Sequence, residues 1–356
     1  MASVAAVTST MFICFLPRAR HAETPPFAVY KGSMSTTIPS SSNIHSHSRV
    51  CLIMVNIFLT GASGYIGSYL TPLLLEAGHK LTALARSDAS AKKLEDQGIT
   101  VIRASLEDTD VLFKAASEAD AVIHLAFVHD FANFAKALET DYTTVETFAK
   151  ALKGTSKILI TTSGLLAAAS PTPSELTPAI EAGRGKSDRL TLSLAASGIR
   201  SHVIRLAPTT HGDGDHGLLT FYIQQSKKAG SAGYVGDGGN HWPAVHVDDA
   251  VKVYKLVLES KTLKGGEVLH AVQDAGIPFN SIAEAVAGKL GIPTKSMTPE
   301  EVEVHYTRLA RFFSRDLVAE STLTREWLGW APKEKGLVED IESSEWYFTP
   351  EAVSKY

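Results

Sequence analysis

Three glycines at intervals of three residues could bind a phosphate group. Residues 60–67 read TGASGYIG and continue the apolar, β-branched run VNIFLT. In a strand–loop–helix unit, the first glycine permits a tight turn, the second lets a pyrophosphate approach the backbone, and the third lets the helix pack on the strand. Backbone N–H groups and the helix dipole then face the phosphates. We predict a dinucleotide site with contacts from Thr60, Gly61, Ser63, Gly64, Tyr65, Ile66 and Gly67.

The end of the next strand indicates which dinucleotide is bound. An acidic residue at this place typically accepts hydrogen bonds from the ribose hydroxyls of NAD. This chain instead has Arg86 and Ser87. A guanidinium suits a 2′-phosphate by its charge and its bidentate geometry. Asp88 is the opposing signal. The pattern favours NADP(H), with NAD(H) as the alternative.

Polar side chains that follow predicted strands could transfer protons. His129 and Asp130 come after the run AVIHLAF, and ligands bind beyond the carboxyl ends of strands in open α/β sheets. Histidine titrates near neutral pH, so His129 is a candidate proton donor. Further candidates of this kind are His211, Asp215, His216 and His241. The stretch HGDGDH has a spacing that suggests metal ligands, but glycine-rich loops often read this way, and we predict no metal site.

The elements that would position these residues alternate between strand and helix. This alternation predicts a parallel sheet with right-handed crossovers. The regularity weakens beyond Pro208. The predicted fold class is therefore α/β, a Rossmann-type doubly wound parallel sheet with a smaller C-terminal substrate lobe. Strand runs lie at 55–60, 80–85, 100–104, 121–127, 157–163 and 201–207, with helical patterns at 65–78, 90–98, 111–119, 131–152 and 183–197.

Composition excludes several classes of protein. A chain of 356 residues, 44% hydrophobic and 20% charged, suits a soluble globular protein with a sizeable core. The net charge of −4 provides no basic footprint for nucleic acid or for a membrane surface. Cys14 and Cys51 both precede the first strand. A disulfide framework, a cysteine metal site and a cysteine nucleophile are therefore excluded for the body of the protein.

The first part of the chain differs from the rest. Residues 1–54 are rich in Ser and Thr, and their only acid is Glu23. The apolar centre of TSTMFICFLP is too short to span a bilayer, and it lacks the basic start of a secretory signal. We expect a disordered leader and a cytoplasmic protein, with organelle targeting by residues 1–54 as an open alternative. The nucleotide-binding domain would then comprise 55–207 and about 244–275, and the substrate-binding lobe about 208–243 and 276–356.

Several segments together resemble the extended and atypical short-chain dehydrogenase/reductase superfamily, whose members include NAD(P)-dependent epimerase/dehydratase-like proteins. They are the glycine loop, HLA at 124–126, TTSG at 161–164, RLAPTTHG at 205–212, VHVDDA at 245–250 and the C-terminal LTREWLGWAPKEKGLVEDIE. The resemblance implies a catalytic serine at Ser163. It also implies further cofactor contacts from Leu106, Leu125, Ala126, Phe127 and Pro208.

The chain departs from this superfamily where its members carry the pattern Tyr-x-x-Ser-Lys. Residues 184–188 read RGKSD, so Arg184 stands for the tyrosine and Asp188 for the lysine. An arginine does not release its proton at neutral pH, but it can stabilise negative charge on a substrate oxygen. We expect Ser163, Arg184 and Asp188 to be catalytic, with Asp188 holding Arg184 or the ribose, and with water or His129 supplying the proton. The structural alternative is that Arg184 and Asp188, four residues apart on a helix, only pair with each other.

The resemblance implies an NADP(H)-dependent oxidoreductase that transfers hydride on a carbonyl, an alcohol or an activated alkene of a small or mid-sized organic molecule. One alternative is a non-redox isomerase or dehydratase on the same fold. Another is a non-catalytic NADP(H) sensor. The resemblance also allows a homodimer through the helices at 131–152 and 184–197. Four residues could form an apolar wall of the cleft or belong to the core: Leu165, Leu218, Tyr222 and Trp242.

Overall fold

The computed structural model describes residues 54–130 and 132–353. The chain divides into two units, Met1–Val50 and Cys51–Tyr356, and every described residue belongs to the second. The predicted leader therefore lies outside the described residues, apart from Met54. None of the helices in the described part combines the length and the apolar character that crossing a bilayer requires.

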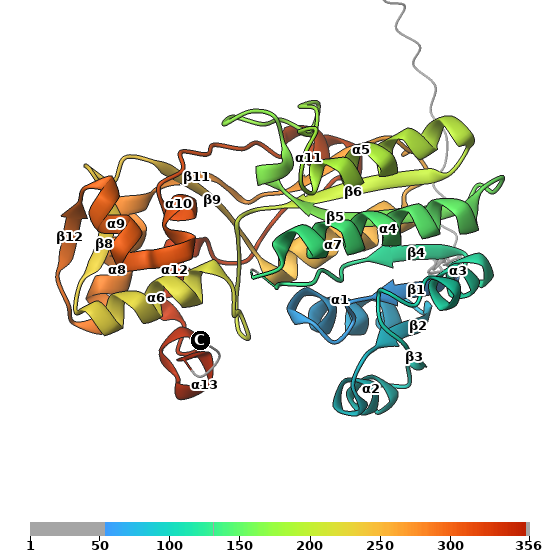
Figure 1. The fold of residues 1–356 in the computed structure, drawn as a ribbon, viewed down its shortest axis with the longest axis horizontal. Coiled ribbons are helices and arrows are strands. Elements are labelled where there is room, and N and C mark those ends of the chain that lie inside the picture. Colours follow the sequence, from blue (N-terminus) through green and yellow to red (C-terminus); the bar gives the residue numbers. More distant parts are fainter. Residues whose placement is uncertain (1–53, 131, 354–356) are drawn as a thin grey trace, which may run out of the picture. The chain divides into compact units, whose positions relative to one another are not determined.

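A parallel sheet of seven strands forms the centre of the described unit, in the order β10-β6-β5-β4-β1-β2-β3 (Figure 1). Every neighbouring pair of strands is parallel. The order reverses between β1 and β4, as in a doubly wound sheet, so the predicted fold class is confirmed. The strands are β1 (Asn56–Thr60), β2 (Lys80–Ala85), β3 (Thr100–Arg103), β4 (Ala121–His124), β5 (Ile158–Gly164), β6 (Arg200–Leu206) and β10 (Val268–Ala271).

Helices cover both faces of this sheet. Alternate residues of a strand point to opposite faces, and β1 shows the result: Ile57 and Leu59 join one buried cluster and Phe58 joins another. The first cluster includes side chains of α1, α2 and α7, and the second includes side chains of α3 and α4. The helices around the sheet are α1 (Tyr65–Glu76), α2 (Asp88–Glu95), α3 (Thr109–Glu118), α4 (Phe134–Leu152), α5 (Gly185–Ser193), α7 (Val247–Glu259) and α11 (Thr322–Leu328).

A C-terminal lobe has its own buried cluster of side chains. Tyr222 and Trp242 lie within this cluster, and Leu165 lies within a sheet cluster, so these three residues belong to the core rather than to an exposed cleft wall. Leu218 is partly buried against the lobe cluster. The lobe helices and strands are α6 (Leu218–Ala229), β8 (Ala232–Val235), α8 (Phe279–Leu290), β12 (Thr294–Met297), α9 (Pro299–Tyr306), α10 (Ala310–Phe313), α12 (Leu337–Ser343) and α13 (Pro350–Val353).

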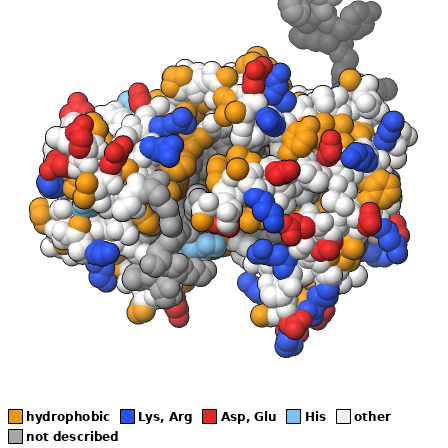
Figure 2. Space-filling view, in the orientation of Figure 1, with side chains coloured by type: hydrophobic (Ala, Val, Ile, Leu, Met, Phe, Trp, Pro, Cys, Tyr) orange, Lys and Arg blue, Asp and Glu red, His pale blue; other side chains and the backbone are white. Residues whose placement is uncertain are grey.

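A small mixed sheet joins segments on either side of the lobe. Its order is β11-β9-β7, with β7 and β9 parallel and β9 and β11 antiparallel. Its strands are β7 (Thr209–His211), β9 (His241–His246) and β11 (Asp274–Pro278). The face shown in Figure 2 is hollowed near its middle, and its positive and negative side chains are interspersed rather than gathered by sign. The domain boundaries expected from the sequence stay a prediction.

Candidate active site

The glycine loop has the backbone geometry that a pyrophosphate site needs. Gly61 has φ of +79°, a conformation that side chains disfavour, and an added Cβ would stand 2.7 Å from the Ala126 nitrogen. A Cβ on Gly67 would stand 2.2 Å from the Gly61 carbonyl oxygen, so helix and loop touch only because that atom is absent. Helix α1 begins at Tyr65 with no acidic residue in its first turn and no side-chain cap. Its first N–H groups therefore remain available to an anion.

The end of β2 presents an exposed positive charge. Arg86 is solvent-exposed, and no other described residue pairs with it. Ser87 caps α2 by accepting a hydrogen bond from the Ser90 nitrogen at 3.2 Å. Asp88, the opposing signal of the sequence, forms an ion pair with Arg103. At the end of β2, the positive charge of Arg86 is therefore not neutralised by an acidic side chain of the described residues.

Arg184 lies at the N-cap of α5 and reaches across to β5. Its Nη2 donates to the Thr162 carbonyl oxygen, next to Ser163, and lies 3.4 Å from Asp141 Oδ1. Its guanidinium stacks 4.4 Å above the centre of the Phe127 ring. The buried Nε atom has no hydrogen-bond partner among the described residues. The side chain, 24% exposed, thus keeps donors for a ligand beside Ser163.

A buried network that the motifs did not reveal holds Arg184 in place. Asp141 of α4 is 3% exposed and accepts a hydrogen bond from Ser187 Oγ at 2.5 Å. Its other oxygen lies 3.6 Å from His124 Nε2, and His124 Nδ1 lies 2.6 Å from Thr60 Oγ1. Burial alone raises the pKa of Asp141, but His124 and Arg184 outweigh it, so the pKa is lowered and the carboxylate stays charged. Thr60, predicted to contact the cofactor, therefore also anchors this network.

Asp188 pairs with a different arginine. Its Oδ2 accepts from Arg205 Nε at 3.2 Å, and both side chains are almost fully buried. The structural alternative, in which Arg184 and Asp188 only pair with each other, is wrong because Arg184 pairs with Asp141 and Asp188 pairs with Arg205. Burial raises the pKa of Asp188, and the Arg205 charge partly offsets that effect.

Ser163, at the end of β5, lies beside the Asp188–Arg205 ion pair. Ser163 pairs in register with Arg205 of β6, so both residues stand in one row across the sheet. Its Oγ is buried and lacks a partner with good hydrogen-bond geometry, although it lies close enough to Asp188 to lower the pKa of that carboxyl. A buried hydroxyl without a full partner is uncommon and indicates room for a ligand group.

His129 lies near Arg184, as a proton donor for the same site would. The ring keeps a solvent-exposed surface, yet burial by the surrounding protein lowers its pKa, and the charge of Arg184 lowers it further. Phe127 contacts both groups: its ring lies 5.3 Å from the His129 ring and beneath the Arg184 guanidinium. The remaining predicted cofactor residues are Leu106, which is buried, and Leu125, Ala126, Phe127 and Pro208, which are half-buried after β4 and β6.

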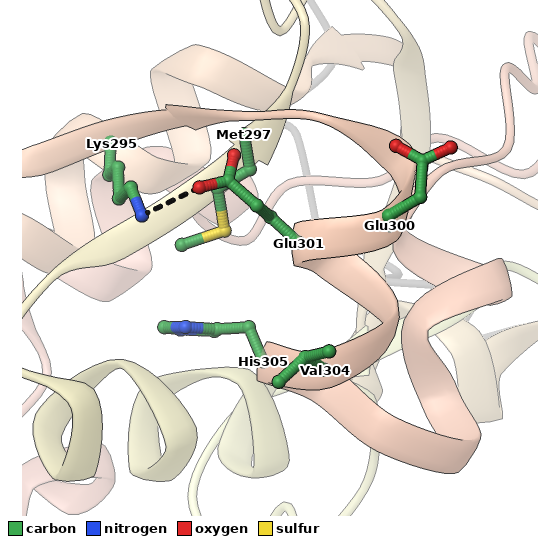
Figure 3. A pocket seen from close by; sticks show the side chains of 6 residues that line it. All are labelled: Lys295, Met297, Glu300, Glu301, Val304 and His305. Atoms are coloured by element: carbon green, nitrogen blue, oxygen red, sulfur yellow. Dashed lines mark hydrogen bonds and ion pairs between the residues drawn. The ribbon is translucent and has the colours of Figure 1, made fainter.

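Figure 3 shows a separate surface hollow of about 430 Å³ between β12 and α9. Lys295 and Glu301 form an ion pair across it at 3.1 Å, and Val304 and His305 lie on its α9 side. None of the predicted cofactor or catalytic residues lines this hollow, so it is distinct from the candidate active site.

The comparisons with known proteins agree with this geometry. The family model described as "NAD dependent epimerase/dehydratase family" matches residues 57–180. An uncharacterized protein of Schizosaccharomyces pombe is 39% identical over 297 residues, which is 82% of this chain and 100% of that protein. An uncharacterized protein of Saccharomyces cerevisiae is 37% identical over 296 residues, which is 82% of this chain and 99% of that protein. The chain belongs to the NAD-dependent epimerase/dehydratase family of short-chain dehydrogenase/reductases.

A solved structure shows the same fold. The Bordetella bronchiseptica enzyme WbmG, in complex with NAD and UDP, superposes with a TM-score of 0.67 over 85% of this chain and 97% of that chain, at 18% identity. The family therefore supports a nicotinamide dinucleotide as the cofactor, and the glycine loop fits its pyrophosphate. Arg184 and Asp188 each have a charged partner on another element, Asp141 of α4 and Arg205 of β6.

Proposed function

We propose that the chain is an NADP(H)-dependent oxidoreductase acting on a carbonyl, an alcohol or an activated alkene of a small or mid-sized organic molecule. One observation carries the proposal. Arg184, which the resemblance aligns with the family's tyrosine, is bonded to the backbone beside Ser163 and keeps an unpartnered Nε. Ser163 Oγ also lacks a partner with good hydrogen-bond geometry. Together they offer two donors to one substrate oxygen.

The cofactor preference rests on the end of β2. Arg86 is exposed and unpaired among the described residues, while Asp88 is held by Arg103. A 2′-phosphate would find a planar, bidentate cation there, and the nearby acid would repel it little because its charge is already paired. This arrangement favours NADP(H) over NAD(H).

Each side chain of the site has a different role in the proposed reaction. A dinucleotide held by the glycine loop would supply or accept the hydride through its nicotinamide. During reduction, the π electrons of the substrate carbonyl move to its oxygen, where Ser163 Oγ–H and the Arg184 guanidinium stabilise the negative charge. Arg184 keeps its own proton. His129 or water then protonates the alkoxide. Asp141 orients Arg184 through its ion pair. The Asp188–Arg205 ion pair fixes the side chains next to Ser163.

A second function, a non-catalytic NADP(H) sensor, is favoured by a specific observation. The groups that replace the family's Tyr and Lys are both engaged inside the protein, Arg184 with Asp141 and Asp188 with Arg205. A third, suggested by the epimerases among the solved structures of this fold, is isomerisation with no net change of cofactor. Oxidation of NADPH, tight binding without turnover, and product formation without net oxidation distinguish the three.

The proposal is tested by the absorbance of NADPH with a panel of aldehydes, ketones and enones, followed by variants on the best substrate. Arg184→Ala should lower turnover tens- to thousand-fold, the range seen when an oxyanion donor is removed, with NADPH affinity near that of the wild type. Arg184→Lys should recover part of the loss. Arg189→Ala, a change on α5 that removes the exposed ion pair of Arg189 with Glu181, is the matched control. Full activity of Arg184→Ala would contradict the proposal.

We also propose that the protein forms a homodimer through α4 and α5 and that it is located in the cytoplasm. Sedimentation of the full chain and imaging of a C-terminal fusion check these two points separately.

A further inference from the structure

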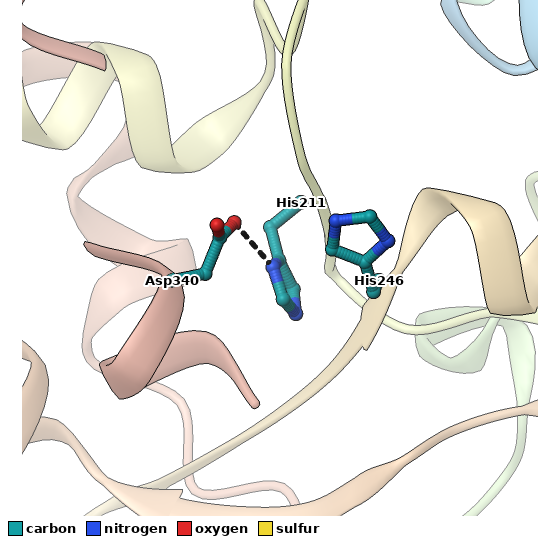
Figure 4. A group of neighbouring side chains, drawn as sticks. All are labelled: His211, His246 and Asp340. Atoms are coloured by element: carbon teal, nitrogen blue, oxygen red, sulfur yellow. Dashed lines mark hydrogen bonds and ion pairs between the residues drawn. The ribbon is translucent and has the colours of Figure 1, made fainter. Parts of the chain in front are cut away.

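Three side chains from separate parts of the chain meet where the small mixed sheet contacts the C-terminal lobe (Figure 4). His211 ends β7 and His246 ends β9, and the two are register partners on parallel strands. Register partners point to the same face of a sheet, and their rings stand 5.2 Å apart at 86°. Asp340 comes from α12, and its Oδ2 lies 2.8 Å from His211 Nδ1.

The three side chains offer ligand atoms in a small volume. One ligand atom from each residue lies within 4.8 Å of those of the other two. His246 uses Nδ1 to accept a hydrogen bond from the Asp248 nitrogen, which caps α7. Its Nε2 is the nitrogen left to a ligand, and Figure 4 shows the His246 ring beside His211.

Buried polar atoms around this trio lack partners. His211 is fully buried, and its Nε2 has no hydrogen bond. The same holds for Tyr65 Oη and for Asp215 Oδ2. Gly212 connects these groups, because a Cβ added to it would stand 3.2 Å from both His246 Nε2 and Tyr65 Oη. Several unsatisfied atoms at one buried place indicate a polar ligand rather than separate packing defects.

The charges in this region favour a cation. Asp340 is buried, and among the described residues it forms no ion pair with a lysine or an arginine. Buried carboxylates are normally paired or bound to a metal. The absence of a lysine or arginine partner at Asp340 also makes the place unsuited to a phosphate or another anion.

We propose that His211, His246 and Asp340 bind a divalent transition-metal ion, with zinc as the representative. Two imidazoles and a carboxylate suit zinc and related ions. Ligands of one tetrahedral zinc ion stand about 3.4 Å apart, so side-chain rotations must close the most distant pair. Tyr65 or water would complete the coordination. The three ligands are not among the residues proposed for hydride transfer or for cofactor binding, so the two proposals stand or fall separately.

The proposed zinc site differs from the sequence prediction, which placed no metal site at HGDGDH. Of that stretch only His211 contributes to the trio, while its other ligands lie 35 and 129 residues further along the chain. Their spacing in the sequence therefore carries no metal-binding signal, and only the pairing of β7 with β9 and the position of α12 bring them together.

The test uses the full chain after removal of metals with a chelator. Titration with ZnCl₂ followed by calorimetry should show one ion per chain with a Kd of about 1 μM or tighter, and Co²⁺ should give the absorption bands of a low-coordinate site. His211→Ala and Asp340→Asn should weaken binding at least about 10-fold. His246→Asn should do the same while it keeps an acceptor for the cap of α7.

The control is a histidine with the same kind of partner. His241 pairs with Asp316 at 2.9 Å on the surface, so His241→Ala should leave metal binding unchanged. Thermal unfolding followed by circular dichroism reports whether each variant is folded. Absence of stoichiometric Zn²⁺ binding by the wild type, or a folded His211→Ala variant that binds Zn²⁺ as tightly as the wild type, would overturn the proposal. The trio would then be a hydrogen-bonded His–Asp pair beside a second histidine.

Discussion

The two ends of the candidate active site are built in different ways. At the glycine loop the functional groups belong to the backbone, and they are exposed because Gly61 and Gly67 lack side chains where a Cβ would collide with neighbouring backbone. Around Arg184 the functional groups belong to side chains, and each depends on a charged partner from another element, Asp141 of α4 or Arg205 of β6.

This difference indicates which part of the site can accept substitutions and which part cannot. A backbone site tolerates no added atom, because the carbonyl and amide groups it brings together have no alternative position. A side-chain site can be rebuilt, provided that every buried charge keeps a partner. At this end of the site, Arg184 and Asp188 each have such a partner, Asp141 and Arg205.

The largest effect is expected from Gly67→Val. Its Cβ would stand 2.2 Å from the Gly61 carbonyl oxygen, so loop and helix must separate, at a cost of about 3 kcal/mol or more in the free energy of unfolding. NADPH binding should be lost. Thermal unfolding and NADPH titration measure both. Gly288→Ala is the control, because a Cβ there meets nothing within 4 Å and a helix interior favours alanine. Normal NADPH binding by Gly67→Val would show that the backbone end is not rigid.

Asp188→Ala should have the next largest effect. It leaves the fully buried Arg205 without its ion-pair partner, which typically costs about 3–5 kcal/mol. Arg184→Ala should cost less, about 1–2 kcal/mol, because Asp141 retains Ser187 and His124. Urea denaturation at neutral pH compares the two variants. If both lose under about 1 kcal/mol, the buried pairs do not hold this end of the site together. The double variant Asp188→Leu/Arg205→Met should regain part of the loss.

Arg86→Asp should have a smaller and more selective effect. It removes a favourable charge and introduces a repulsive one at the place of a 2′-phosphate. NADPH affinity should fall by about 10-fold or more, which is about 1.4 kcal/mol, and NADH affinity should stay close to that of the wild type. Fluorescence titration with both cofactors measures the difference. Lys93→Asp, at an exposed position of α2, is the control. Equal weakening of both cofactors would mean that Arg86 does not contact the phosphate.

The smallest effect concerns the pH response of His129. Burial lowers its pKa, and Arg184 lowers it further, so Arg184→Ala should raise that pKa toward the ordinary value near 6.5. A histidine with a lowered pKa binds fewer protons in the folded state, so it contributes a loss of wild-type stability as the pH falls through about 6.5. The Arg184→Ala variant should lose less stability over the same pH range. NMR titration of the imidazole protons follows the pKa, with His246 as the reference. An unchanged His129 pKa would place Arg184 too far away to act with it.

Much of the fold could be predicted from the sequence. The strand predicted at 80–85 is β2, the helix predicted within 131–152 contains α4, and the strand run at 201–207 overlaps β6. These elements are determined by local hydrophobic patterns. Beyond Pro208 the prediction was coarse, because β7 pairs with β9 and β8 pairs with β12 across long intervening segments. Such pairings depend on what packs together rather than on any local pattern.

The candidate site divides in the same way. The glycine loop could be found because each glycine meets a local backbone requirement. Ser163 and Arg184 were predicted from the resemblance of TTSG and RGKSD to motifs of the superfamily. Asp141 and Arg205 were missed as partners. One signal was present: Arg205 is a charged residue within the apolar stretch VIRLA, and such a residue needs a partner. Which acidic residue pairs with Arg205 could not be deduced, because the chain has many acidic residues and the sequence does not show which of them lies nearby.

The sequence by itself determined the groups whose role depends on local backbone conformation, above all the turn at Gly61 and the helix start at Tyr65. Only the tertiary structure decided which charges meet. Arg184 meets Asp141 across 43 residues of chain, and His211 meets Asp340 across 129. The physical reason is that a backbone conformation is set by its own residues, whereas the energy of a buried charge is set by whatever the whole fold places beside it.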